Sequence, residues 1–159
     1  MAVRMLPNSE LVAISYIQTM PGVMADVVST QPPADETQWG ENGCITVTVV
    51  GGHPDVGLPV RNPLMQVDMF ATNPGSDKIP WFKANALAEQ VWMATLDKQQ
   101  VGRVVSITAG GREYPPAKVL TAFWMTEPRR IYGDKGDWAH YSGDLAMSWT
   151  ITTPIPNGY

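Results

Sequence analysis

Two histidines and the acidic residues near them are the first candidates for chemistry in this chain. His53 lies two residues before Asp55, and His140 lies between Asp137 and Asp144. Imidazole and carboxylate groups can bind divalent metals, but neither histidine has a second one four residues away on a shared helical face. With a single cysteine in the chain, the usual structural zinc sets are also unavailable. We therefore expect no metal site and no cofactor.

Motifs for phosphate binding and nucleophilic catalysis are incomplete. Gly52 and Gly57 have the gap of a phosphate-binding loop, but Leu58 and Pro59 follow where a lysine and a hydroxyl side chain are needed. The Gly-x-Ser-x-Gly turn of many hydrolases is absent from the sequence. Cys44 begins a segment of alternating apolar residues, which predicts a small buried side chain rather than a nucleophile.

Paired acidic residues are the remaining candidates for acid/base chemistry. Asp134 with Asp137, or Glu127 with Asp144, could act in this way only inside a desolvated cleft that separates their pKa values. Their glycine-rich, polar surroundings indicate solvated loops instead. We expect no catalytic residue and no enzymatic activity.

Two segments have the apolar spacing of helices. The first begins at Asn8 or Ser9, either of which can cap a helix, and ends before Pro21. The second spans residues 80–97 and begins with Pro80, whose missing amide hydrogen is not needed in a first turn. The predicted buried stripes are Val12, Ala13, Tyr16, Ile17 and Met20 in the first helix, and Ala84, Leu87, Ala88, Val91 and Thr95 in the second.

Strand patterns fill most of the remaining chain. The segments at 44–50 and 63–71 alternate apolar and polar residues and should pair with each other. Long polar loops are expected at 30–43 and 127–140, and an extended arm at 153–159. No internal repeat is present, so residues 1–159 are expected to form a single domain. The other predicted strands are 25–29, 103–108, 117–126 and 141–152.

These elements predict an α+β fold, a mainly antiparallel or mixed sheet with two helices packed on one face. The segment 117–126 carries apolar residues on both faces, so two helices would leave apolar area uncovered. We expect a neighbouring subunit to cover it. The two expected faces are Leu120, Ala122 and Trp124 on one side, and Val119, Phe123 and Met125 on the other.

Composition narrows the classes of function. Only 16% of the 159 residues are charged, against about 25% in typical domains, while six Trp and nine Met are many for this length. The net charge of -4 argues against nucleic-acid binding as the main activity. Neither a signal peptide nor a membrane-spanning apolar run is recognisable. We expect a soluble protein that is intracellular when synthesised.

Basic residues gather around the last predicted hairpin. Two interpretations stay open for them: a solvated loop, or a surface facing a polyanion or an acidic partner. The group comprises Arg112, Lys118, Arg129, Arg130 and Lys135.

Several segments resemble the tail terminator, or tail completion, proteins of long-tailed bacteriophages, particularly those of actinobacterial hosts. The similarity covers nearly the whole chain and rests on the order and texture of the elements. It is carried by the segment 62–74, the Pro80-Trp81 pair, the segment 84–88, a first helix closing in Met20-Pro21-Gly22, a strand ending in Gly51-Gly52, and a closing strand from Tyr141.

The resemblance implies a hexameric ring that caps the finished tail tube, stops its polymerisation and presents the surface for joining the DNA-filled head. It implies a virion protein assembled in the host cytoplasm, with the tail tube protein and a neck or head-completion protein as partners. DNA would be passing cargo in the channel, and no membrane would be involved. The alternatives are another adaptor of the virion neck, or a small ligand-binding domain or enzyme with a concave polar pocket.

A closed ring needs two different patches on each subunit, because one patch must meet another on the next copy. Large apolar side chains outside the predicted core and tryptophans in the long loops are the candidates, and we expect Ala in place of either loop Trp to leave the fold intact. The expected interface residues are Trp39, Phe82, Met93, Leu96 and Trp138. The expected channel-facing or partner-facing basic residues are Arg112, Arg129 and Arg130.

Overall fold

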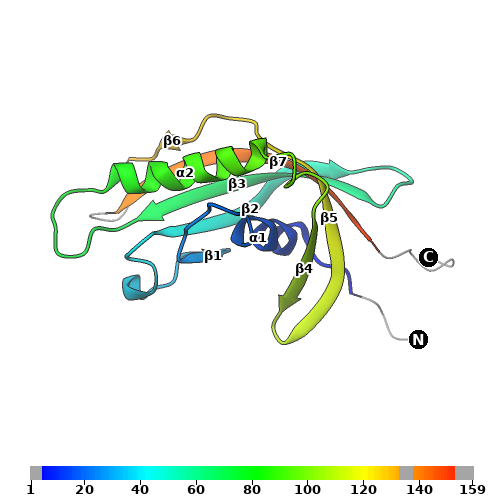
Figure 1. The fold of residues 1–159 in the computed structure, drawn as a ribbon, viewed down its shortest axis with the longest axis horizontal. Helices are drawn as coiled ribbons and strands as arrows, with labels where there is room; N and C mark the ends of the chain where they lie inside the picture. The colour runs from blue at the N-terminus through cyan, green and yellow to red at the C-terminus, as the bar shows by residue number, and fades with distance from the viewer. Residues whose placement is uncertain (1–4, 133–137, 153–159) are drawn as a thin grey trace.

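The fold, a computed structural model that describes residues 5–132 and 138–152, combines two α-helices with a curled sheet (Figure 1). The expected α+β class is confirmed. The helices are α1 (Ser9–Gln18) and α2 (Trp81–Leu96), and a short 3-10 turn, η1, covers Glu36–Gln38. The strands are β1 (Val27–Ser29), β2 (Cys44–Pro54), β3 (Val60–Ala71), β4 (Val104–Ala109), β5 (Arg112–Trp124), β6 (Arg129–Arg130) and β7 (Ala139–Ile151).

The first helix begins and ends where the sequence predicts. The Asn8 side chain accepts a hydrogen bond from the Leu11 amide at 2.8 Å, which satisfies one of the free donors of the first turn. After Gln18 the chain turns through Pro21 and Gly22, and Gly22 has a φ of 85° that favours glycine. The asparagine cap is therefore confirmed.

The second helix follows Pro80 and has no side-chain cap. One position of its predicted stripe is wrong: Ala94 is buried, whereas Thr95 is half-buried and its hydroxyl donates to the Trp92 carbonyl at 2.7 Å. The smaller alanine lets this turn of the helix lie closer to the sheet. The buried residues are Ala84, Leu87, Ala88, Val91 and Ala94.

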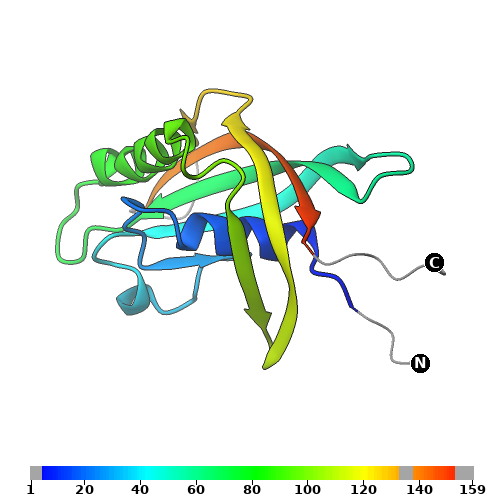
Figure 2. The same ribbon diagram turned by 45° about the vertical axis from the view of Figure 1, so that its right-hand side comes forward.

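The sheet has the order β1-β2-β3-β7-β5-β4, with β6 beside β7. Only the β1–β2 pair is parallel among the described strands; the others are antiparallel. The predicted pairing of β2 with β3 is confirmed. β-Bulges after Val49, Val105 and Val119 bend the strands, and the sheet curls so that β4 and β5 turn away from β2 and β3 (Figure 2).

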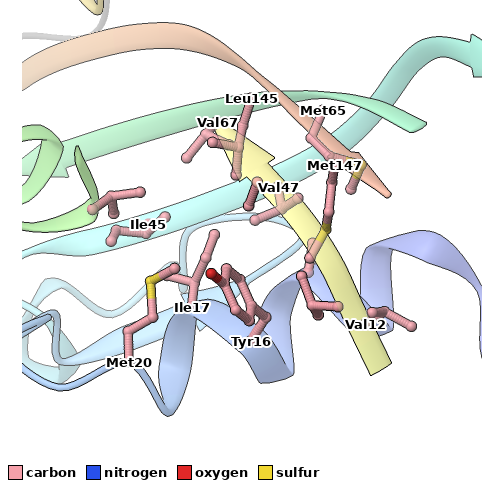
Figure 3. Close-up of a cluster of buried hydrophobic side chains, with 14 of the residues drawn as sticks. Val12, Tyr16, Ile17, Met20, Ile45, Val47, Met65, Val67, Leu145 and Met147 are labelled. Carbon is pink, nitrogen blue, oxygen red and sulfur yellow. The ribbon is translucent and has the colours of Figure 1, made fainter. Parts of the chain in front are cut away.

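The core lies between the concave face of the sheet and both helices. Figure 3 shows side chains of α1 below those of β2, β3 and β7, where Tyr16 and Ile17 approach Val47. Leu87 and Val91 of α2 belong to the same buried cluster. Both helices therefore cover one face of the sheet, as predicted.

The opposite face of the central strands is largely polar, whereas Phe123 and Met125 of the predicted segment 117–126 are 51% and 57% exposed. Thr46 and Asp68 are buried there, and Thr48 is exposed. In β5 the bulge after Val119 changes the alternation, so that Val119 and Ala122 both pack in the core while Phe123 is exposed. The segment 117–126 therefore leaves the apolar side chains of Phe123 and Met125 uncovered in the subunit, and other exposed apolar side chains lie elsewhere.

Candidate functional site

The outer flank of α2 exposes a row of large apolar side chains. Phe82 is 85% exposed, and Met93 and Leu96 are each more than half exposed, on the stripe that also carries Glu89. These three side chains lie where the helical period predicts, opposite the buried alanines. Trp92 is 45% exposed on the same helix and was missed, because the sequence offers no signal to separate it from the core stripe.

A groove lies between α2 and the segment that follows β5. Its volume is about 340 Å³, near the lower end of ligand pockets, which hold roughly 300–1,000 Å³. Trp92 and Trp124 are its largest lining side chains, and Glu89 and Glu127 supply its charges. Its lining residues are Ala88, Glu89, Trp92, Trp124, Met125, Thr126, Glu127 and Pro128. The groove is therefore an aromatic hollow with an acidic margin.

Two details of Trp124 define the floor of this groove. A Cβ on Gly143 would lie only 3.0 Å from the Trp124 ring, so glycine in β7 makes room for the indole. The indole Nε1 is buried and has no hydrogen-bond partner among the described residues. A buried donor without an acceptor is costly, and the packing of the indole must offset that cost.

The β2–β3 hairpin projects from the molecule on the side away from α2 (Figures 1 and 2). Residues 48–54 are all exposed, and beyond them Val56 is 99% and Leu58 63% exposed. The sequence predicts the end of this strand at Gly51-Gly52, but the ladder continues to Pro54. We call residues 49–62 the hairpin arm.

Hydrogen bonds within the hairpin arm hold its shape. The Asn62 amide donates to the Asp55 carboxylate at 2.8 Å, and the Asp55 amide donates to the Val60 carbonyl at the same distance. Ser148 of β7 donates to the Asn62 side-chain oxygen at 2.6 Å and ties the base of the arm to the sheet. The carboxylate of Asp55 is thus turned toward the arm itself.

The loop tryptophans do not lie as expected. Trp39 is fully buried, so its side chain is not an exposed contact in this structure, which corrects the expectation. It meets Trp138 edge to face with ring centroids 4.8 Å apart. Trp138 is half-buried, and its Nε1 donates to Glu36 at 2.7 Å. The two long loops therefore pack on each other through these rings.

An acid–imidazole pair lies beside these rings on the polar face of the sheet. Asp68 Oδ1 and His140 Nε2 are 2.7 Å apart, and both side chains are nearly buried. Burial alone would raise the pKa of Asp68, but hydrogen bonds from His140, Ser142 and Gln66 outweigh it, so the pKa is lowered. The pair links β3 to β7, which are neighbours in the sheet.

The expected basic cluster is divided by the fold. Arg112 lies at the β4–β5 turn, whereas Arg129 and Arg130 lie in β6 on the other side of the molecule (Figures 1 and 2). Arg130 Nε donates to the Tyr141 hydroxyl at 3.0 Å, and its guanidinium lies 5.0 Å from the Trp81 ring centroid. Lys135 is outside the described residues. The three arginines therefore do not form one surface within the subunit.

The structure also shows where the side chains that were expected to be chemically inert lie. Cys44 is buried, and burial raises the pKa of its thiol to about 11. His53 and Asp55 lie in the hairpin arm and His140 in β7, and Asp134 and Asp137 lie outside the described residues. Within residues 5–132 and 138–152, no group of three histidine, cysteine or acidic side chains could hold a metal ion. None of the described helices is long and apolar enough to span a bilayer.

Comparisons with known proteins find similarity in structure but not in sequence. No protein-family model matches the chain, and no curated protein matches it in sequence. Among solved structures, a chain of the virion of a native gene transfer agent particle is similar, with a TM-score of 0.47 and 13% identity. The alignment covers 90% of this chain and 86% of that chain. This likeness concerns chain shape alone.

Proposed function

We propose that this chain is a structural protein of a phage-like virion, which terminates the tail tube as a hexameric ring and provides the surface for head joining. The proposal rests on the sequence resemblance to tail terminators and on how the resembling segments fold. The segment 62–74 forms most of β3 and the following turn, Pro80-Trp81 begins α2, and Met20-Pro21-Gly22 follows α1.

The observation that carries the proposal is the presence of two unlike apolar surfaces on one subunit. One is the projecting hairpin arm with Val56 and Leu58, and the other is the α2 flank with Phe82 and Met93 beside the groove. Large exposed apolar side chains that rim a groove or a projecting turn mark candidate contact surfaces. Two different patches are what a head-to-tail contact needs, and such contacts close into rings when the rotation allows.

The remaining partners follow from this assignment. The ring would contact the tail tube protein on one side and a neck or head-completion protein on the other, with DNA passing through the channel. A net charge of -4 per subunit fits a channel that does not grip DNA. The proposed location is the virion, after assembly in the host cytoplasm.

Tube growth in vitro tests the function directly. Purified tail tube protein from the same phage would be polymerised with and without this chain, and tube lengths would be measured by electron microscopy. The proposal predicts that tubes stop growing when the chain is added. Tubes that elongate normally while the chain binds only the head or portal side would instead identify another neck adaptor.

A further inference from the structure

We propose that residues 153–157 of one copy add a strand to the outer edge of β4 of the next copy. The inference rests on the proposed function, because it names a contact through which identical subunits would join. The occupant of the β4 edge is therefore a second copy of this chain. A C-terminal segment and a sheet edge are unlike surfaces, so the contact is head-to-tail, as a closed ring requires.

β4 lies at the border of the sheet, with β5 on one side and no described strand on the other (Figure 2). Half of its backbone N–H and C=O groups therefore point to an edge that has no strand partner among the described residues. Val105 and Ile107 face the core. The alternate side chains, Val104, Ser106 and Thr108, are exposed. The outer edge of β4 is thus a template for a further strand.

The β4 edge lacks the charged residues and prolines that often protect border strands from pairing with another chain. The segment Val104–Ala109 contains neither, and most of its residues are β-branched, which favours strands. β1, at the opposite border, has only three residues, whereas β4 has six. β4 is therefore the border strand that is better suited to a partner.

The C-terminal segment has the sequence of a strand that can pair on one side only. Residues 153–157, which lie outside the described part of the chain, read Thr-Pro-Ile-Pro-Asn. Backbone N–H groups alternate between the two sides of a strand, and Pro154 and Pro156 have none. Thr153, Ile155 and Asn157 can therefore pair with β4 on their side. The proline side cannot extend the ladder, so the added strand would end the sheet.

β7 ends beside a part of β5 that cannot continue the ladder. The last pair of the β7–β5 register joins Ile151 to Ala117, and the Thr152 amide donates to the Pro116 carbonyl at 3.2 Å. Pro116 and Pro115 have no N–H to donate in return. The next residues of β5 therefore offer the C-terminal segment no backbone donor.

Residues 153–157 cannot lie along β4 of their own copy. β5 and β4 follow β7 in the sheet order, so the outer edge of β4 is three strand spacings, about 14 Å, from the end of β7. An extended chain advances about 3.3–3.6 Å per residue, so the crossing would use at least about four residues after Thr152. Pairing would then begin near Asn157, beyond both prolines. The matching edge is therefore that of another copy.

Cross-linking of single-cysteine variants tests the contact in the full-length chain. Ser106→Cys and Ile155→Cys would be purified separately, mixed and treated with a short bis-maleimide, both in concentrated solution and on tail tubes. We expect covalent dimers in the mixture, because the two positions meet between different copies. Wild type controls for Cys44, and Ile155→Cys mixed with Asp77→Cys, an exposed site before α2, controls for random collision.

Proline substitution separates backbone pairing from side-chain contact. Ile155→Pro removes the N–H that would face β4, whereas Ile155→Ala removes most of the side chain and keeps the N–H. We expect Ile155→Pro to raise the chain concentration needed for half-maximal ring assembly at least about tenfold above that of Ile155→Ala. Pro154→Ala, on the outer side, should stay within about fivefold of wild type. Equal effects of the two Ile155 variants would contradict backbone pairing.

The outcomes separate this contact from the proposed function. Tubes that stop growing without any cross-link between positions 106 and 155 would overturn the contact and leave the function standing. Dimers from either variant alone would also overturn the contact, because they would show that like positions meet symmetrically. A 106–155 cross-link in copies that never stop tube growth would support the contact and contradict the function. Unimpeded tube growth without any cross-link would contradict both.

Discussion

At the scale of single residues, Trp39 is buried in the structure although its sequence context predicts an exposed contact. A tryptophan in a polar, glycine-containing loop is typical of an exposed contact, which was the prediction. In the structure it packs edge to face on Trp138, and its Nε1 donates to the Pro33 carbonyl at 3.0 Å. The large aromatic side chain of Trp39 therefore indicates burial correctly, whereas its polar loop context wrongly indicates exposure.

Replacement of Trp39 should therefore impair folding before it impairs any contact. We expect Trp39→Ala to lower the free energy of unfolding by about 3–5 kcal/mol, since a fully buried ring would leave a cavity. Trp39→Phe keeps most of the packing and should cost less. Chemical denaturation measures both. A Trp39→Ala variant as stable as wild type would show that the ring is not packed as described.

Asp68 predicts an acid-dependent part of the stability. The pKa of its carboxyl is lowered in the folded state, so its contribution is present above the pKa of the unfolded chain, near 4, and is lost as pH falls through the lower folded value. Asp68→Asn should therefore be less stable than wild type at pH 7, and the difference should shrink below about pH 4. Denaturant unfolding between pH 2 and 7 measures this. A difference that stays constant with pH would contradict an ionised, hydrogen-bonded Asp68.

At the scale of elements, the helices and most strands follow from periodicity and capping, because α1, α2 and the β2–β3 pair depend on local patterns. The hairpin arm does not follow from local patterns. Gly51, Gly52 and Pro54 are typical strand breakers, yet the ladder continues through them. The start of β5 was missed for the same reason at Pro115 and Pro116. The placement of β7 between β3 and β5 depends on contacts far apart in sequence, which no local pattern encodes.

Gly52 makes the close approach within the hairpin arm possible. Its φ is 90°, and a Cβ there would lie 2.1 Å from the Asn62 carbonyl oxygen. Gly57 also has a positive φ, but a Cβ there would meet nothing within 4 Å. Gly57→Ala should cost only the backbone strain, about 1–2 kcal/mol, and Gly52→Ala should cost more. Unfolding free energies of the two variants test this, and equal values would refute the close approach.

Arg103 joins the edge of the sheet to α1. Its guanidinium donates to the Tyr16 carbonyl at 2.7 Å and to the Thr19 carbonyl at 3.0 Å, and it lies 5.0 Å from the Tyr16 ring centroid. It thereby satisfies carbonyls at the end of the helix, where a positive charge is also favoured by the helix dipole.

Loss of this link should loosen both elements. We expect Arg103→Ala to lower the unfolding free energy by about 1–3 kcal/mol, because charged hydrogen bonds to helix carbonyls are lost. Arg103→Lys keeps the positive charge but loses the planar guanidinium, so it should recover only part of the lost unfolding free energy. Hydrogen exchange of the α1 amides would report the local effect. Unchanged exchange in Arg103→Ala would show that α1 is held by packing alone.

At the scale of the whole molecule, the sequence indicated that a single copy leaves apolar area uncovered. Part of it lies where it was expected, since Phe123 and Met125 are exposed, and more lies on the hairpin arm and on the α2 flank. The bulge after Val119 places both Val119 and Ala122 in the core, which the alternation in the sequence did not predict. The exposure of Phe82, Met93 and Leu96 on α2 was predictable from the helical period, and the hairpin arm was not.

The proposed assembly of this chain is a ring of identical copies that ends the tail tube. It can be tested by electron microscopy of tube ends that are assembled with the purified chain and averaged with symmetry determined from the images. We expect a ring of six copies at one end of each tube. Tube ends without additional density, or density from a single copy of the chain, would rule out this ring.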